Sequence, residues 1–288
     1  MNSPETERDE RTLTSDDGTS LALHTLSSQR SQSPHLLVAH ATGFCARMYE
    51  PLAQEAGFTC SALDFRGHGD SDRPSDTTYP WERFGEDALT AARQLSQRFG
   101  PLIGFGHSMG GASLLMAAVE APDLFVKLYV YEPIVLPPTL ARPGESPLVA
   151  AARRRRDHFP SVAAALENFR RKPPLSELAP EVLELYVHAG FRSDPDGGIR
   201  LKCRREDEAQ IFATSGIDAA WEKLADLQVP TLVAFGEKQR GFGPHSWAPE
   251  IAERLPRGRT EAFPGLGHLG PFESPTTVAR SASSWLGR

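Results

Sequence analysis

Cysteine is scarce in this chain, with three in 288 residues. Cys45, Cys60 and Cys203 are odd in number and lack the close spacing of zinc ligands, so neither a disulfide scaffold nor a metal site is expected. The chain also lacks an apolar run long enough to span a bilayer, and residues 1–11 lack the basic and apolar regions of a signal peptide. We therefore expect a cytoplasmic protein without a membrane segment.

An excess of basic residues is also missing. The chain has 31 lysines and arginines against 37 aspartates and glutamates, which gives a formal net charge of -6. This balance gives no electrostatic reason to expect binding to nucleic acid or to an anionic membrane. What the chain does have is 40% hydrophobic residues, enough for one large α/β domain or for one domain that carries an insertion.

Strand and helix patterns alternate along the first half of the chain. Residues 12–26 are typical of two short strands joined by a turn at Asp16, Asp17 and Gly18. The alternation that follows favours parallel strands with right-handed crossovers. Strands are predicted at residues 35–40, 59–65, 102–107 and 127–132, and helices at residues 46–56, 81–99 and 109–121.

The alternation stops at Pro137 and Pro138, and the chain is then mostly helical and interrupted by prolines, with a strand-like piece at residues 198–203. It resumes with strands at residues 230–235 and 259–263 and helices at residues 247–255 and 275–286. We therefore predict three parts. They are a flexible N-terminus at residues 1–11, an α/β core at residues 12–136 and 228–288, and a helical cap at residues 137–227.

The sequence Gly106-His107-Ser108-Met109-Gly110 lies between an apolar strand pattern and a helix pattern. A serine at such a corner takes a strained backbone conformation, and glycines two positions before and after it let the strand and helix pass without side-chain clashes. A serine hydroxyl needs a base to accept its proton. His268 lies on a glycine-rich loop just after the last predicted strand, which suits it to that role.

With these motifs the chain resembles an α/β-hydrolase. Residues 40–44 resemble the oxyanion loop of that family, residues 64–72 resemble its segment after the fourth strand, and residues 267–275 resemble its histidine loop. The resemblance implies a mostly parallel eight-stranded sheet flanked by helices, with a helical cap. It also implies that the backbone N–H of Met109 and that of Thr42, or alternatively Ala41, hold the oxyanion.

The third member of the catalytic group departs from the commonest pattern of the family. Gln239 occupies the place where many relatives have an aspartate, and a neutral amide cannot stabilise an imidazolium as a carboxylate does. Glu132, at the end of the sixth strand, resembles the alternative acid position of haloalkane dehalogenases and some relatives. Glu237 is nearer the usual site but directly follows the strand's glycine. We favour Glu132 and keep Glu237 as the alternative.

The predicted function is that of a serine hydrolase that cleaves a small-molecule carboxylic ester and needs no cofactor or metal. Other chemistry on the same fold remains open: carbon–carbon bond hydrolysis, perhydrolysis, acyl transfer, or ligand binding without turnover. Phe44, His107 and Leu269 are the predicted substrate contacts. Asp64, Arg66, His68 and Asp70 are interpreted as structural, and the basic run at residues 153–156 as a solvated face. The oligomeric state is not predicted.

Overall fold

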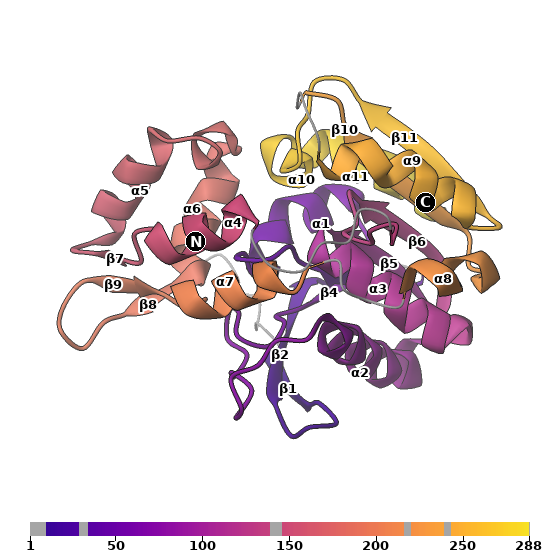
Figure 1. Ribbon diagram of the computed structural model, residues 1–288, viewed down its shortest axis with the longest axis horizontal. Coiled ribbons are helices and arrows are strands. Elements are labelled where there is room, and N and C mark those ends of the chain that lie inside the picture. The colour runs from indigo at the N-terminus through magenta and orange to yellow at the C-terminus, as the bar shows by residue number, and fades with distance from the viewer. Residues whose placement is uncertain (1–9, 29–33, 139–145, 216–219, 239–242, 288) are drawn as a thin grey trace, which may run out of the picture.

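The central element of the molecule is an eight-stranded sheet (Figure 1). The computed structural model describes residues 10–28, 34–138, 146–215, 220–238 and 243–287. The strand order is β1-β2-β4-β3-β5-β6-β10-β11; β1 and β2 pair in antiparallel fashion, β2 is antiparallel to β4, and the other pairs are parallel. The strands are β1 (Glu10–Thr14), β2 (Ser20–Ser27), β3 (Leu36–Ala39), β4 (Cys60–Leu63), β5 (Leu102–His107), β6 (Phe125–Tyr131), β10 (Thr231–Gly236) and β11 (Gly258–Phe263).

The central strands are apolar because both of their faces are covered. Side chains alternate between the faces of a strand, so Leu37 of β3 joins one hydrophobic cluster and Val38 joins the other. The first cluster contains side chains of α2 (Trp81–Phe99), α3 (Met109–Glu120) and α9 (Pro244–Arg254). The second contains side chains of η1 (Ala46–Tyr49), α1 (Glu50–Ala56) and α11 (Pro275–Leu286). The predicted mostly parallel eight-stranded sheet flanked by helices is therefore confirmed.

Between β6 and β10 the chain forms a separate group of elements, drawn to the left of the sheet in Figure 1. An aromatic cluster of Phe159, Phe169, Tyr186 and Phe191 lies inside this group. Its elements are α4 (Pro147–Arg154), β7 (His158–Phe159), α5 (Val162–Arg170), η3 (Leu175–Glu177), α6 (Pro180–Gly190), β8 (Phe191–Ser193), β9 (Ile199–Leu201) and α7 (Arg205–Ala213). β7, β9 and β8 form a small antiparallel sheet, of which the sequence indicated only the middle strand.

The last part of the predicted cap segment lies elsewhere. α8 (Ala220–Lys223) and η4 (Leu224–Asp226) pack against the core, since Trp221 and Leu224 belong to the same buried cluster as α3. The predicted boundary at residue 227 thus differs from the packing, because these apolar side chains find their partners on the core helices. At the other end β1 begins at Glu10, so residues 10–11 of the predicted flexible N-terminus are part of the sheet.

The remaining elements are η2 (Pro122–Leu124), which precedes β6, and α10 (Gly270–Glu273), which precedes α11. In the part of the chain that the structure describes, no helix has both the length and the apolar character needed to cross a bilayer.

Candidate active site

The chain turns sharply at Ser108, between β5 and α3. Ser108 has φ 55° and ψ -115°, a conformation that is strained for a residue with a side chain. A Cβ atom on Gly106 would lie 2.6 Å from Gly111 Cα, and one on Gly110 would lie 2.1 Å from the carbonyl oxygen of Ala39. Only glycine fits at both positions, as the sequence predicts for a nucleophile elbow.

The structure brings Ser108, His268 and Glu132 together. His268 Nε2 lies 3.1 Å from Ser108 Oγ, and His268 Nδ1 lies 2.6 Å from Glu132 Oε2. A carboxylate accepts, so Nδ1 carries the proton and Nε2 is left to accept the proton of the serine hydroxyl. Serine, imidazole and carboxylate therefore form one continuous hydrogen-bonded chain with the polarity that removes a proton from Ser108.

Glu132 reaches His268 from the end of β6. Its side chain is fully buried, and its second oxygen accepts a hydrogen bond of 2.9 Å from the N–H of Gly236, the last residue of β10. Glu237, the alternative acid, is exposed on the loop after β10, where its N–H donates to the carbonyl of Phe263. The geometry therefore favours Glu132 over Glu237. Gln239 lies outside the described residues.

Two backbone N–H groups beside Ser108 are uncommitted. Met109 is the first residue of α3, where N–H groups have no acceptor within the helix, and Thr42 lies opposite it on the loop after β3. Thr42 Oγ1 is 3.3 Å from Met109 Sδ, so the two residues are in contact. In the described residues neither N–H donates to a protein acceptor. The N–H of Ala41, by contrast, donates to the hydroxyl of Tyr49 at 3.2 Å, which favours Thr42 over Ala41 as the second oxyanion donor.

His107 does not have the position of a substrate contact. It is fully buried, its Nδ1 lies 2.8 Å from the Tyr49 hydroxyl, and its Nε2 lies 2.8 Å from the carbonyl oxygen of His268. The prediction of His107 as a substrate-binding residue is therefore wrong, because both ring nitrogens bind protein groups. Burial, followed by the nearby His268, holds the pKa of His107 well below its usual value.

The other two predicted substrate contacts lie near the triad. Phe44 is half-buried, and its ring centre lies 5.8 Å from that of Tyr186 on α6 and 5.0 Å from that of Phe272 on α10. Leu269 directly follows His268 and is mostly buried. Phe44 thus lies between the group of helices outside the sheet and the histidine loop, and contact of either residue with a substrate stays a prediction.

Two side chains that were not predicted as site residues, Tyr131 and Glu273, bond to the histidine loop. The Tyr131 hydroxyl donates to the carbonyl of Gly267 at 2.9 Å, and a Cβ atom on Gly270 would lie 2.1 Å from that same hydroxyl. The N–H of Gly267 donates to Glu273 at 3.3 Å. Tyr131 is the last residue of β6 and directly precedes Glu132. Only the folded arrangement shows which loop its hydroxyl reaches.

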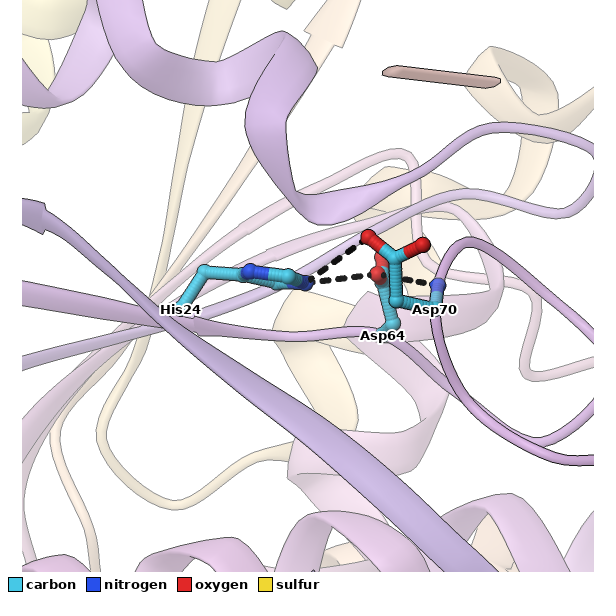
Figure 2. A group of neighbouring side chains, drawn as sticks. All are labelled: His24, Asp64 and Asp70. Atoms are coloured by element: carbon cyan, nitrogen blue, oxygen red, sulfur yellow. Dashed lines mark hydrogen bonds and ion pairs between the residues drawn. The ribbon is translucent and has the colours of Figure 1, made fainter. Parts of the chain in front are cut away.

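A second cluster of polar groups fixes the segment after β4 (Figure 2). His24 Nε2 lies 2.8 Å from Asp64 and 3.9 Å from Asp70, and Asp64 also accepts from the N–H groups of Ala46 and Asp70. Burial alone would raise the pKa of Asp64, but the hydrogen bond and charge of His24 lower it to about 2. Lys202 forms an ion pair with Asp70. The carboxylate oxygens of Asp64 and Asp70 thus already bind N–H groups, His24 and Lys202, which occupy the positions that a metal ion would need. This supports the interpretation of Asp64 and Asp70 as structural residues.

Arg66 has the same kind of role. Its guanidinium, 1% exposed, donates to Asp87 at 2.8 and 2.6 Å and to Asp17 at 2.6 Å. Asp87 is buried on α2, so this fork joins the segment after β4 to that helix.

The basic run at residues 153–156 is only partly solvated. Arg153 is exposed, whereas Arg155 is half-buried and donates to Glu208 at 2.5 Å and to the hydroxyl of Tyr186. A Cβ atom on Gly43, which has φ 80°, would lie 2.3 Å from a Glu208 oxygen. The interpretation as a solvated face thus fails for Arg155, because the acidic first turn of α7 packs it against the oxyanion loop.

A groove of about 930 Å³ runs between α1 and α6, lined in part by Arg47, Glu50 and His188, but Ser108 is not among its lining residues. The candidate site is therefore defined by the chemistry around Ser108 rather than by this groove.

The chain is similar to proteins that are named as hydrolases and lipases. The model of the alpha/beta hydrolase family matches residues 36–281. The chain is 24% identical over 260 residues to the 2-(acetamidomethylene)succinate hydrolase of Mesorhizobium japonicum, covering 90% of both chains. It is 30% identical over 274 residues to an sn-1-specific diacylglycerol lipase of Mus musculus, covering 88% of this chain and 79% of the lipase.

Solved structures agree on the fold. The crystal structure of E-2-(acetamidomethylene)succinate hydrolase superposes with a TM-score of 0.76 at 22% identity, covering 98% of this chain and 100% of the other. The enol-lactonase of Burkholderia xenovorans superposes with a TM-score of 0.72 at 19% identity, covering 96% and 100%. The extent of the family match, together with the sheet order and the elbow, shows that this chain belongs to the alpha/beta hydrolase family.

Proposed function

We propose that this hydrolase is a serine hydrolase that cleaves a small-molecule carboxylic ester through an acyl-enzyme. The observation that carries the proposal is the unbroken chain of hydrogen bonds from Ser108 through His268 to Glu132. The lipase among the relatives supports an ester as substrate. In this proposal the reaction needs only water and groups of this chain, and the enzyme acts in the cytoplasm.

In the proposed reaction Ser108 Oγ attacks the ester carbonyl carbon while its proton moves to His268 Nε2. The C–O bond of the tetrahedral intermediate then breaks, and the leaving alkoxide takes that proton from Nε2. Water attacks the acyl-enzyme with His268 again as base, which releases the acid and restores the serine hydroxyl. The buried Glu132 holds the imidazole in the tautomer with its proton on Nδ1 and stabilises the imidazolium.

The N–H groups of Thr42 and Met109 would stabilise the negative oxygen of the intermediate. Both lie beside Ser108 and are free of protein acceptors in the described residues, so no bond has to break before they bind the oxyanion. Losing one such donor typically costs about 10²- to 10³-fold in kcat.

We also propose that residues 147–213 form the cap of this enzyme and line the substrate site. Phe44 touches Tyr186 of this segment, and Glu208 lies against Gly43 of the oxyanion loop. Ligands of open α/β sheets bind at the carboxyl ends of the strands, which is where Ser108, Glu132 and His268 lie. Substrate choice would then depend on side chains of the cap.

Purified protein and its Ser108→Ala variant test the proposal. The wild type should hydrolyse short p-nitrophenyl esters and react with a fluorophosphonate probe, and the variant should lose about 10⁴-fold or more in kcat and all labelling. Ser96→Ala, on α2 far from the elbow, is the matched control. Labelling that persists in Ser108→Ala would mean that the nucleophile is wrong.

A second candidate activity is the one that the bacterial relative's name records. The extent of that match justifies adding 2-(acetamidomethylene)succinate to the substrate panel. A carbonyl compound without an ester oxygen in the same panel tests carbon–carbon bond hydrolysis. A wild type that binds these compounds but turns over none of them, and fails to react with the probe, would favour a ligand-binding protein instead.

A further inference from the structure

We infer that Tyr49 and His68 are positioning residues: they bind the N–H groups on either side of Thr42 and so leave the Thr42 N–H free to bind the oxyanion. His107 is a third positioning residue, because it joins Tyr49 to the backbone of the catalytic base His268. The inference rests on the proposed function and adds to it three residues that do not touch the substrate. It starts from where the N–H groups of the oxyanion loop donate.

In the loop after β3, three of the four N–H groups of residues 41–44 donate to protein acceptors. The N–H of Ala41 donates to the Tyr49 hydroxyl at 3.2 Å, that of Gly43 to His68 Nε2 at 3.0 Å, and that of Phe44 to the carbonyl of Ala41 at 3.2 Å. Thr42 is left with its N–H uncommitted among the described residues. Its two neighbours are thus fixed by side chains that come from elsewhere in the chain.

His68 can accept from Gly43 only as one tautomer. Its Nδ1 lies 3.0 Å from the carbonyl oxygen of Arg66, which accepts only, so Nδ1 carries the proton and Nε2 has a free lone pair. His68 is fully buried, and burial together with the neighbouring His40 lowers its pKa to about 3. The ring therefore stays neutral at physiological pH and keeps accepting from Gly43.

Tyr49 gains its acceptor role from His107. His107 Nε2 lies against the carbonyl of His268, so Nε2 carries the proton and Nδ1 accepts from the Tyr49 hydroxyl. Because that hydroxyl gives its proton to His107, its lone pairs face the N–H of Ala41. A directional path thus runs from the oxyanion loop through Tyr49 and His107 to the backbone of His268.

These hydrogen bonds hold the oxyanion loop and the loop of His268 in a fixed position relative to each other. The oxyanion donor and the general base must keep their relative position, since a misplacement of about 1 Å can cost 10²-fold in rate. Packing alone would be served equally well by apolar side chains. The observed bonds fix the direction of two loop amides and of one carbonyl.

The test removes single polar atoms. Tyr49→Phe should lower kcat for p-nitrophenyl acetate about tenfold or more while KM changes less than about twofold, because the lost bond to Ala41 orients the loop whose Thr42 N–H binds the developing oxyanion. The affinity for a trifluoromethyl ketone, which forms an oxyanion adduct with serine, should fall in proportion to kcat/KM. His68→Leu should behave in the same way, and His68→Gln, which retains an acceptor, should recover most of kcat.

Tyr129→Phe is the matched control. Tyr129 is also a fully buried tyrosine, on β6, and its hydroxyl bonds to Ser281 on α11, away from the oxyanion loop. Its kcat and ketone affinity should equal those of the wild type. If Tyr49→Phe and His68→Leu also retain wild-type kcat and ketone affinity, the three residues have only a structural role. A wild type that reacts with neither ester nor ketone would overturn the proposed function and this inference with it.

Discussion

Ser108 and Glu132 share an unusual backbone property. With Thr77 they are the non-glycine residues of the described chain that have positive φ, at 55° for Ser108 and 44° for Glu132. Each such conformation costs about 1–3 kcal/mol and persists only where the surroundings enforce it. Here neighbouring strands do so, because the N–H of Ser108 donates to Tyr131 and that of Glu132 donates to Ala234. Strain at two members of the candidate triad agrees with preorganisation of the site.

The identity of the acid gives a prediction at this scale. Glu132→Gln keeps the shape of the side chain but cannot fix the tautomer of His268, so kcat should fall by about 10⁴-fold. Glu237→Gln should stay within about twofold of the wild type, since that side chain is exposed. Steady-state kinetics of both variants on one ester measures the difference.

A loss in Glu237→Gln as large as that in Glu132→Gln would contradict the assignment. A Tm for Glu132→Gln that stays near the wild-type value would exclude unfolding as the cause of its low kcat.

Sequence alone could place Ser108, because a strand, a tight glycine-flanked turn and a helix are encoded locally, and His268, because it lies on a glycine-rich loop after the last predicted strand. Glu132 could be proposed only through a family resemblance, since its partner His268 is 136 positions away. His107 was predicted to contact the substrate, but its ring is fully buried. Nothing near it in sequence shows that Tyr49 and the carbonyl of His268 occupy its two nitrogens.

The first turn of α7 explains how the proposed cap is attached to the core. Three consecutive acids point to three different arginines: Glu206 to Arg153, Asp207 to Arg73, and Glu208 to Arg155. The first pair is exposed and contributes little. The side chain of Asp207 is 1% exposed and accepts a bidentate hydrogen bond from Arg73, with an N–O distance of 2.6 Å at each of its two oxygens. Arg73 follows the Asp64 segment, so this bond joins α7 to the core.

Removing that bond should destabilise the protein strongly. Arg73→Met leaves the buried Asp207 carboxylate without its cation, which should lower the free energy of unfolding by about 2–4 kcal/mol. Arg153→Ala, which opens the exposed pair, should change it by less than about 0.5 kcal/mol. Urea unfolding followed by tryptophan fluorescence measures both. Equal losses in the two variants would show that burial of the pair does not matter.

The bounds of a helix or strand were predicted best where the residues of that element alone show its pattern and its end. The helices predicted at residues 81–99 and 275–286 have those bounds in the structure, since each has a long amphipathic pattern and a glycine at its end. The helix predicted at residues 46–56 is instead η1 followed by α1, with Pro51 at the start of α1. β7 and β8 were not predicted, because strands of two and three residues exist only through their pairing with β9.

Over the whole molecule, four buried histidines have lowered pKa values. Burial lowers the pKa of His35 to about 4, with Arg98 and Arg11 adding to the effect, and that of His68 to about 3. It also lowers the pKa of His40 and holds that of His107 well below its usual value. His35 and His40 flank β3, His68 lies in the segment after β4 and His107 ends β5, and all four rings are buried. Their protonation is therefore linked to unfolding of the entire core.

The sign of this linkage predicts how stability depends on pH. The unfolded chain binds a proton on each of these histidines below about pH 6.5, whereas the folded chain does not until the pH falls to the lowered pKa. The free energy of unfolding should therefore be retained above about pH 6.5 and fall as the pH drops, by up to about 1.4 kcal/mol per pH unit for each histidine. For His35 the pH window extends from about 6.5 down to about 4.

His35→Gln removes one such group at a site away from Ser108, where the ring stacks on Phe99 and bonds to Ser61. Urea midpoints at pH 7.5, 6.5, 5.5 and 4.5 should fall less steeply for this variant than for the wild type, and parallel curves would show that folding does not lower the pKa of His35.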